Sequence, residues 1–143
     1  MERFLDRCTP YVYAIMRIMV GLLFACHGAQ KLFGVLGGFR GQPGMTVPLG
    51  SLMGLAGMIE FGGGLIIALG LLTHYTAFLA SGHMAVAYFM AHAPRGFWPI
   101  QNRGEMAVLF CFVFLYMAMH GAGAWSFDRV LGISKRASLA QSP

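Results

Sequence analysis

Long apolar tracts separated by short polar segments dominate the chain. The first tract runs from about residue 11 to 33, after a polar lead over residues 1–10 that ends at Pro10. At about 1.5 Å per helical residue this tract extends roughly 34 Å, enough to cross the ~30 Å hydrocarbon core of a bilayer. The pattern therefore predicts a transmembrane helix over residues 11–33.

The remaining apolar residues predict further helices of the same kind. Residues 49–92 are apolar almost throughout, which is too long for one membrane span and suits two, at 49–72 and 73–92, with a tight turn near Leu72. Another tract covers about 105–121, and the polar tail from Ser126 onward is expected to fray. Residues 1–143 are thus predicted to form one domain, an all-α transmembrane four-helix bundle.

Composition supports the lipid bilayer as the surroundings of this chain. Hydrophobic residues make up 57% of it and charged residues only 10%, whereas a soluble domain carries about 25% charged residues. So few charges could not cover a surface in water. The formal charge of +5 comes from cations scattered near the ends of the apolar tracts. They form no basic stripe with interleaved aromatic residues, which argues against nucleic-acid binding.

Loop charges indicate how the bundle is oriented. Four spans place both termini on one side of the membrane. The cations on that side are Arg3, Arg7, Arg129, Lys135 and Arg136. The cations on the other side are Lys31, Arg40, Arg95 and Arg103. Cations are in excess on the cytoplasmic side of membrane proteins. The margin of five against four therefore predicts both termini in the cytoplasm.

Ionisable residues inside the apolar tracts are the candidates for chemistry, because a charge at the centre of a bilayer costs about 3 kcal/mol or more. Glu60 lies 12 residues before Leu72 and His83 lies 11 residues after it, so both would sit about 17 Å from the turn on adjacent helices. Arg17 would be within reach of Glu60. We predict that Glu60, His83 and Arg17 relay protons or contact a ligand. The structural alternative is that Arg17 only neutralises Glu60 among close-packed glycines, of which Gly50-x-x-x-Gly54 is a packing motif.

A second group of polar residues is predicted at one mouth of the bundle. His27 and Lys31 share one face near the end of the first helix. The last helix starts from the same side, so the loop before it brings Arg95, Arg103 and Glu105 beside them. We predict that a ligand is bound there by His27, Lys31, Arg103 and Glu105.

No metal site is predicted. A carboxylate di-iron site needs helical glutamates followed by histidine three residues later, and neither Glu60 nor Glu105 has such a histidine. Haem held by two histidines would need a pair at matched depth. His27 and His92 are the candidates for that less favoured cofactor. The three cysteines include no CxxC pair.

Several segments of the sequence form a recognisable set. They are R-x-x-x-G-L-L-F-x-x-H-G-x-x-K-L-F at residues 17–33, E-F-G-G-G-L at 60–65 with L-G-L at 69–71, N-R-G-E at 102–105, and G-x-G-x-x-S-x-D at 121–128. Together they resemble the DoxX family of small bacterial membrane proteins. The resemblance implies a four-span protein of the inner membrane, often labelled an oxidoreductase and linked to thiosulfate:quinone or terminal quinol oxidation. Other members resemble partners of superoxide dismutase and sulfurtransferase in redox stress, and distant relatives resemble chaperones for membrane cargo.

Two functions are compatible with these residues. A redox accessory would bind a quinone or similar amphiphile inside the bundle, where His or Arg donates to a quinone carbonyl and Glu60 relays protons. A non-enzymatic scaffold or chaperone for partner proteins would use the same polar interior only to set helix register. We favour the first. The sequence leaves open whether the protein is itself an enzyme and whether it forms homo-oligomers.

Overall fold

The computed structural model describes residues 1–133, and this part of the chain is helical without strands. The long helices are α1 (Glu2–Phe33), α2 (Leu52–Leu69), α3 (Thr73–Ala87) and α5 (Glu105–His120). Shorter elements are η1 (Phe39–Gly41), the π-helical turn η2 (Tyr88–His92), η3 (Ala93–Arg95), α4 (Pro99–Asn102) and α6 (Phe127–Val130). The predicted all-α fold is confirmed.

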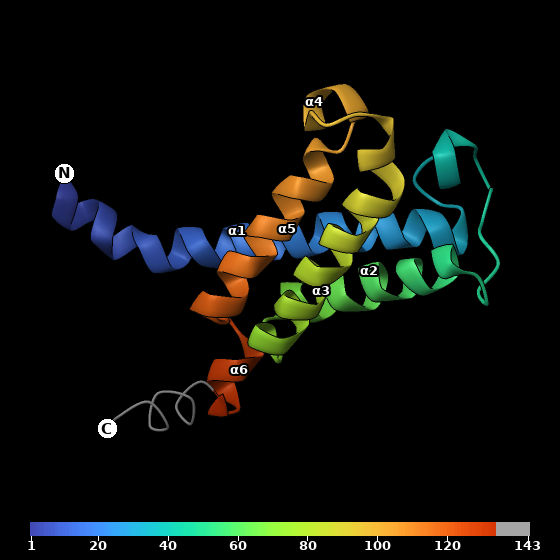
Figure 1. The fold of residues 1–143 in the computed structure, drawn as a ribbon. Helices are drawn as coiled ribbons and strands as arrows, with labels where there is room; N and C mark the ends of the chain where they lie inside the picture. The colour runs from blue at the N-terminus through green and yellow to red at the C-terminus, as the bar shows by residue number, and fades with distance from the viewer. Residues whose placement is uncertain (134–143) are drawn as a thin grey trace.

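The long helices form two antiparallel pairs that cross one another (Figure 1). α1 lies beside α2, α3 lies beside α5, and the second pair crosses the first obliquely. The core fills the space between the pairs, with Phe24 from α1, Ile67 from α2, Ala77 from α3 and Phe114 from α5, each at most 1% exposed. Each long helix thus contributes to a single apolar core, as expected for a helical bundle.

Glycines allow the backbones of α1 and α2 to touch. A Cβ atom added to Gly28 would lie 2.3 Å from the backbone nitrogen of Phe61, and one added to Gly64 would lie 2.5 Å from that of Ala25. Backbone atoms within a helix cannot move aside as a flexible side chain can. Only residues without a Cβ therefore permit this separation of the two helices, which is how small residues act between helices in membranes.

The sequence predicts that the motif Gly50-x-x-x-Gly54 packs against another helix, and this prediction is wrong. Gly50 precedes α2 and a Cβ there would meet nothing within 4 Å. Gly54 instead makes room for the loop leading into its own helix, since its Cβ would lie 2.4 Å from the Pro48 carbonyl oxygen. α2 begins at Leu52 rather than at residue 49, because the Ser51 side chain caps it by accepting a hydrogen bond from the Gly54 N–H.

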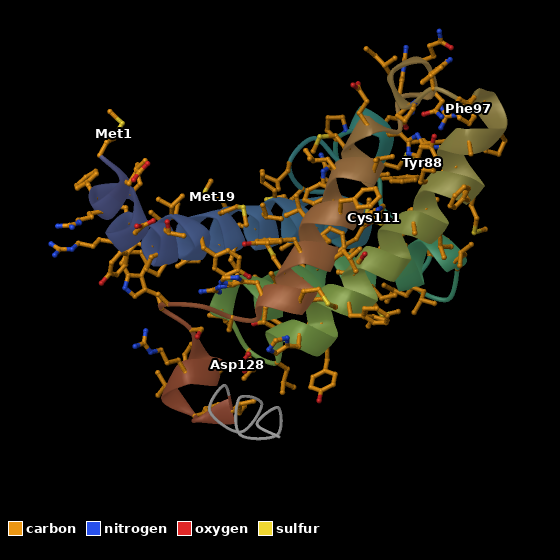
Figure 2. The ribbon with its side chains drawn as sticks, turned by 60° about the vertical axis from the view of Figure 1, so that its left-hand side comes forward. Met1, Met19, Tyr88, Phe97, Cys111 and Asp128 are labelled. Carbon is orange, nitrogen blue, oxygen red and sulfur yellow. The ribbon has the colours of Figure 1, made fainter. Side chains whose placement is uncertain are left out.

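A tight turn joins α2 to α3 where the sequence predicts it. Gly70 and Leu72 adopt left-handed backbone conformations there, with φ of 68° and 47°. The Asp128 carboxylate accepts hydrogen bonds from the N–H groups of Leu72 (2.7 Å) and Thr73 (3.0 Å). Figure 2 shows Asp128 at the end of the α3–α5 pair remote from Tyr88. A residue near the end of the chain therefore satisfies the free donors at the start of α3.

Two predictions about the ends of the chain are wrong. α1 begins at Glu2 and contains Pro10, so residues 1–10 are not a separate lead; a proline removes a single backbone hydrogen bond from this long helix. The tail does not fray at Ser126, because Ser126 and Asp128 are buried and α6 follows. Residues 134–143 of that predicted tail lie outside the described part of the chain.

Two of the helices meet the requirements of a membrane span by themselves. α1 and α2 are long and apolar enough to cross a bilayer, while α5 is an apolar helix of 16 residues. α3 passes directly into the π-helical turn that ends at His92. The helical segment from Thr73 to His92 therefore covers the third tract predicted from the sequence.

The contact between α1 and α2 can be tested with two glycines of the same helix. Gly64→Ala is expected to destabilise the protein by about 1–3 kcal/mol, because the new Cβ overlaps the backbone of α1. Gly62→Ala is the matched control, since a Cβ there meets nothing within 4 Å. It should be neutral or stabilising, because alanine favours a helix over glycine by about 1 kcal/mol. Thermal unfolding in detergent measures both, and equal melting temperatures would contradict the close contact.

Candidate functional site

A buried carboxylate forms the centre of the candidate site. Glu60 on α2 is 5% exposed. The Lys31 ammonium on α1 donates hydrogen bonds to both carboxylate oxygens, and Nε2 of His83 on α3 lies 3.4 Å from Oε1. Side chains from three helices thus meet at one point. The matched depth of Glu60 and His83, expected from their spacing around the turn, is confirmed by this contact.

The glycines between α1 and α2 create the room for this ion pair. Gly28 precedes Lys31 by three residues and Gly57 precedes Glu60 by three, so each glycine shares a helix face with its charged neighbour. A Cβ on Gly57 would lie 3.2 Å from the Lys31 Cβ and 3.0 Å from Leu32 Cδ2. The missing side chain at Gly57 therefore lets Lys31 lie against α2 and reach Glu60.

A cavity of about 140 Å³ lies on the Lys31 side of the carboxylate. One part of its wall is polar and the rest is aromatic or thioether. The lining residues are Phe24, His27, Lys31, Glu60, Met84, Met106 and Phe110. An engineered apolar cavity of about 150 Å³ is known to hold benzene. The cavity therefore has room for about one six-membered ring.

The cavity opens between α1 and α5. His27 and Met106 on its rim are exposed residues. The His27 ring meets Phe110 edge-on with the ring centroids 6.0 Å apart, and Phe24 lies deeper, with its centroid 6.1 Å from that of His83. A ring that entered past His27 would face phenyl groups along its sides and the Lys31 ammonium beyond.

Arg17 does not pair with Glu60, and the predicted contact between them is wrong. Its buried guanidinium donates to the carbonyl oxygens of Ile67 (2.8 Å) and Ala68 at the end of α2, and to those of Ala124 (3.3 Å) and Trp125 (2.8 Å). The last carbonyls of a helix lack partners within the helix and carry its partial negative charge. They hold Arg17 at the end of α2, away from Glu60.

The residues predicted at the mouth do not all reach the cavity. His27 and Lys31 line it, whereas Arg103 and Glu105 are exposed and Glu105 lines a separate cavity at the start of α5. Arg95 donates to a carbonyl of its own helical turn, at 3.0 Å. The ligand-binding roles of Arg103 and Glu105, like the proton-relay roles of Glu60 and His83, stay predictions.

Reasoning from ionisable residues missed the apolar part of the site. Met106 and Phe110 lie four residues apart and therefore on one face of α5, and Met84 follows His83 on α3. The spacing of Met106 and Phe110 was the available signal, but it does not distinguish a cavity wall from ordinary core packing. Asp128 was missed as a capping residue for a different reason, because its partners Leu72 and Thr73 are distant in sequence.

Comparisons with known proteins agree with this architecture, which is that of a helical membrane protein. The DoxX family model matches residues 12–93. An uncharacterized protein of Haemophilus influenzae is 41% identical over 130 residues, which cover 87% of this chain and 93% of that protein. The inner membrane protein YqjF of Escherichia coli K12 is 33% identical over 125 residues, covering 82% of this chain and 89% of that protein. No solved structure matches.

This chain therefore belongs to the DoxX family. The match to YqjF also indicates the bacterial inner membrane as its location. The family model covers α1 from residue 12 onward, together with α2 and α3, and so includes Lys31, Glu60 and His83.

The ion pair at the centre of the site can be tested by a double-mutant cycle. Glu60→Gln leaves the partly buried Lys31 ammonium without its partner and should destabilise the protein by up to about 3–5 kcal/mol, the cost for a fully buried pair. The double variant Lys31→Met with Glu60→Gln should recover most of that loss. The control is Arg17→Met with Glu60→Gln, which should be less stable than either single variant, because Arg17 has carbonyl partners of its own. Unfolding in detergent measures the wild type, the single variants Glu60→Gln, Lys31→Met and Arg17→Met, and both double variants. Recovery of stability in the control double variant instead would contradict the assignment.

Proposed function

We propose that this protein is a redox accessory of the inner membrane that binds a quinone, or a similar amphiphile with a ring-sized head group, in the cavity beside Lys31 and Glu60. The observation that carries the proposal is the wall of that cavity. It combines an ammonium and a carboxylate with two phenyl rings in a space of about 140 Å³. Small-molecule sites typically combine an apolar wall with a few polar groups in this way.

The polar and apolar groups of the cavity suit different parts of a quinone. Lys31 can donate a hydrogen bond to a ring carbonyl, and hydrogen bonds to charged groups contribute about 1.5–3 kcal/mol each. Phe24 and Phe110 can pack against the ring, as aromatic pairs do. The rim at His27 and Met106 is exposed, so in a membrane a hydrocarbon tail can extend from it into the lipid.

The pair formed by Glu60 and His83 supports a role in proton transfer. Reduction of a quinone takes up protons together with electrons, and carboxylates and imidazoles are the groups that most often carry protons in active sites. Electrons would come from a redox-stress protein partner, because no CxxC dithiol occurs in the sequence. This division of tasks is the reason for proposing an accessory rather than an autonomous enzyme.

One observation favours the second candidate, a non-enzymatic scaffold or chaperone. Lys31 contacts both oxygens of Glu60, so the two charges satisfy each other without any ligand. A buried ion pair of this kind can act by specifying how helices pack. In that case the protein would carry no bound quinone and would act by binding partner proteins.

We also propose that the chain crosses the membrane four times with both termini in the cytoplasm. The spans would be α1, α2, the segment from Thr73 to His92, and α5. In Figure 1 the α2–α3 turn and α6 lie at one end of the molecule, and the loop over residues 34–51 and α4 lie at the other. This arrangement suits a bundle whose helices alternate in direction across a bilayer.

Quinone binding is tested by lipid extraction and by titration. Mass spectrometry of lipids extracted from the purified protein is expected to detect a quinone. Isothermal titration with decylubiquinone should detect binding, which the stable double variant Lys31→Met with Glu60→Gln should weaken about 10-fold or more. Arg40→Met, which removes an exposed cation of the 34–51 loop, is the control and should bind as the wild type does. Absence of binding to the wild-type protein would support the scaffold instead.

The orientation is tested by cysteine accessibility in intact cells, after replacement of Cys8, Cys26 and Cys111. A reagent confined to the cytosol should label Ser138→Cys and not Gln42→Cys, because residue 42 lies in the loop on the opposite side. Labelling of Gln42→Cys alone would reverse the proposed orientation. Labelling of both would contradict the number of spans.

A further inference from the structure

A further cavity borders the Glu60 carboxylate through His83, which lines it and contacts Oε1. It is a groove of about 230 Å³ between α2 and α3. Ala56, Ile59, Val86, Ala87 and Met90 are among the residues that line it, and His83 is its single polar lining residue within the described part of the chain. Among residues 1–133, the groove and the Lys31 cavity share no lining residue.

The groove is produced by small side chains and by a change of helix type. Ala56 and Ala87 leave space between α2 and α3 that larger residues would fill. At Tyr88 the α-helix gives way to a π-helical turn, and Met90 of that turn lines the groove. Single π-helical turns are rare and occur frequently at functional sites. The outer part of the groove therefore lies beside a rare backbone conformation.

One ring nitrogen of His83 has no hydrogen-bond partner within residues 1–133. Its Nε2 faces Glu60, whereas its Nδ1 takes part in no hydrogen bond within residues 1–133, although the side chain is only 12% exposed. The Nδ1 atom is not fully buried within the described residues, so it is accessible to a hydrogen-bonding ligand. The groove thus combines an apolar channel with one accessible polar atom, as small-molecule sites typically do.

The lining residues also give the groove a direction. Along α2 it extends from Leu52 at the helix start to Ile59, which is roughly 10 Å at 1.5 Å per residue. His83 lies at the inner end beside Glu60, and Met90 lies toward the outer end. A phospholipid would keep its charged head group at the membrane surface, far from His83. An uncharged amphiphile with a hydrogen-bonding head can instead reach His83 and lay its tail along the apolar groove.

We infer that the α2–α3 groove is a second ligand site, which binds an uncharged amphiphile of the quinone or long-chain alcohol class with its head group on His83. This site goes beyond the proposed function, because it uses different residues from the Lys31 cavity. Since His83 and Lys31 contact the same carboxylate, both sites adjoin Glu60.

The test uses two photoreactive probes with the purified full-length protein in nanodiscs. One is a decylubiquinone analogue carrying a diazirine on its tail, and the other is a diazirine-labelled decane without a head group. Mapping of the cross-links by mass spectrometry should find the quinone probe on α3 between residues 86 and 91 and also near Met106 at the cavity. Competition with unlabelled decylubiquinone should remove both cross-links.

Variants distinguish the groove from the cavity. Ala87→Phe fills the groove and should abolish the α3 cross-link while leaving the one near Met106. Gly82→Phe, on the same helix at a position with nothing within 4 Å of its Cβ, is the matched control and should leave both. His83→Leu should weaken the α3 cross-link of the quinone probe about 10-fold without changing that of the decane probe.

Each failure has a different meaning. Labelling near Met106 without labelling of α3 would overturn this inference and leave the proposed function standing. Equal labelling of α3 by the decane probe and by the quinone probe would also overturn it, because the groove would then only be solvated by lipid chains. Labelling of α3 without labelling near Met106 would support the groove and contradict the cavity proposed above.

Discussion

The contact between the backbones of α1 and α2 is the constraint on which the rest of the structure depends. Gly28 and Gly64 lie so close to the facing helix that neither position can accept a Cβ. In lipid, helices gain little from burying apolar surface, so close van der Waals packing and polar contacts hold them together. The same contact sets the register at which Lys31 meets Glu60, and that ion pair in turn forms one wall of the cavity.

Two buried charges lie on either side of the α2–α3 turn, and backbone groups are the hydrogen-bond partners of both. Arg17 binds carbonyl oxygens at the end of α2, where the helix dipole is negative, and Asp128 binds N–H groups at the start of α3, where it is positive. Each charge thus stabilises helix ends that water would otherwise have to solvate. The residues after α5 are part of the fold for this reason, since they supply Asp128 and two of the carbonyls around Arg17.

The segments that mark this chain as a member of the DoxX family have distinct structural tasks. One group packs helices, another closes the α2–α3 turn, and a third surrounds the carboxylate and its cavity. Lys31 belongs to the last group, and His83, which lies outside these segments, contacts the same carboxylate. The row formed by His83, Glu60 and Lys31 therefore connects the groove with the cavity, which links the proposed proton transfer to the proposed ligand binding.

The sequence by itself determined the helical tracts, the turn near Leu72 and the shared depth of Glu60 and His83. Each of these depends on spacing within one helix or across one tight turn, where geometry leaves little freedom. Only the tertiary structure decided that Lys31, rather than Arg17, pairs with Glu60. The long connection over residues 34–51 does not fix the position of α1 along α2. The backbone contacts at the glycines of these two helices fix that position. The capping role of Asp128 also needed the fold, because its partner Thr73 lies 55 residues away and no local pattern links the two.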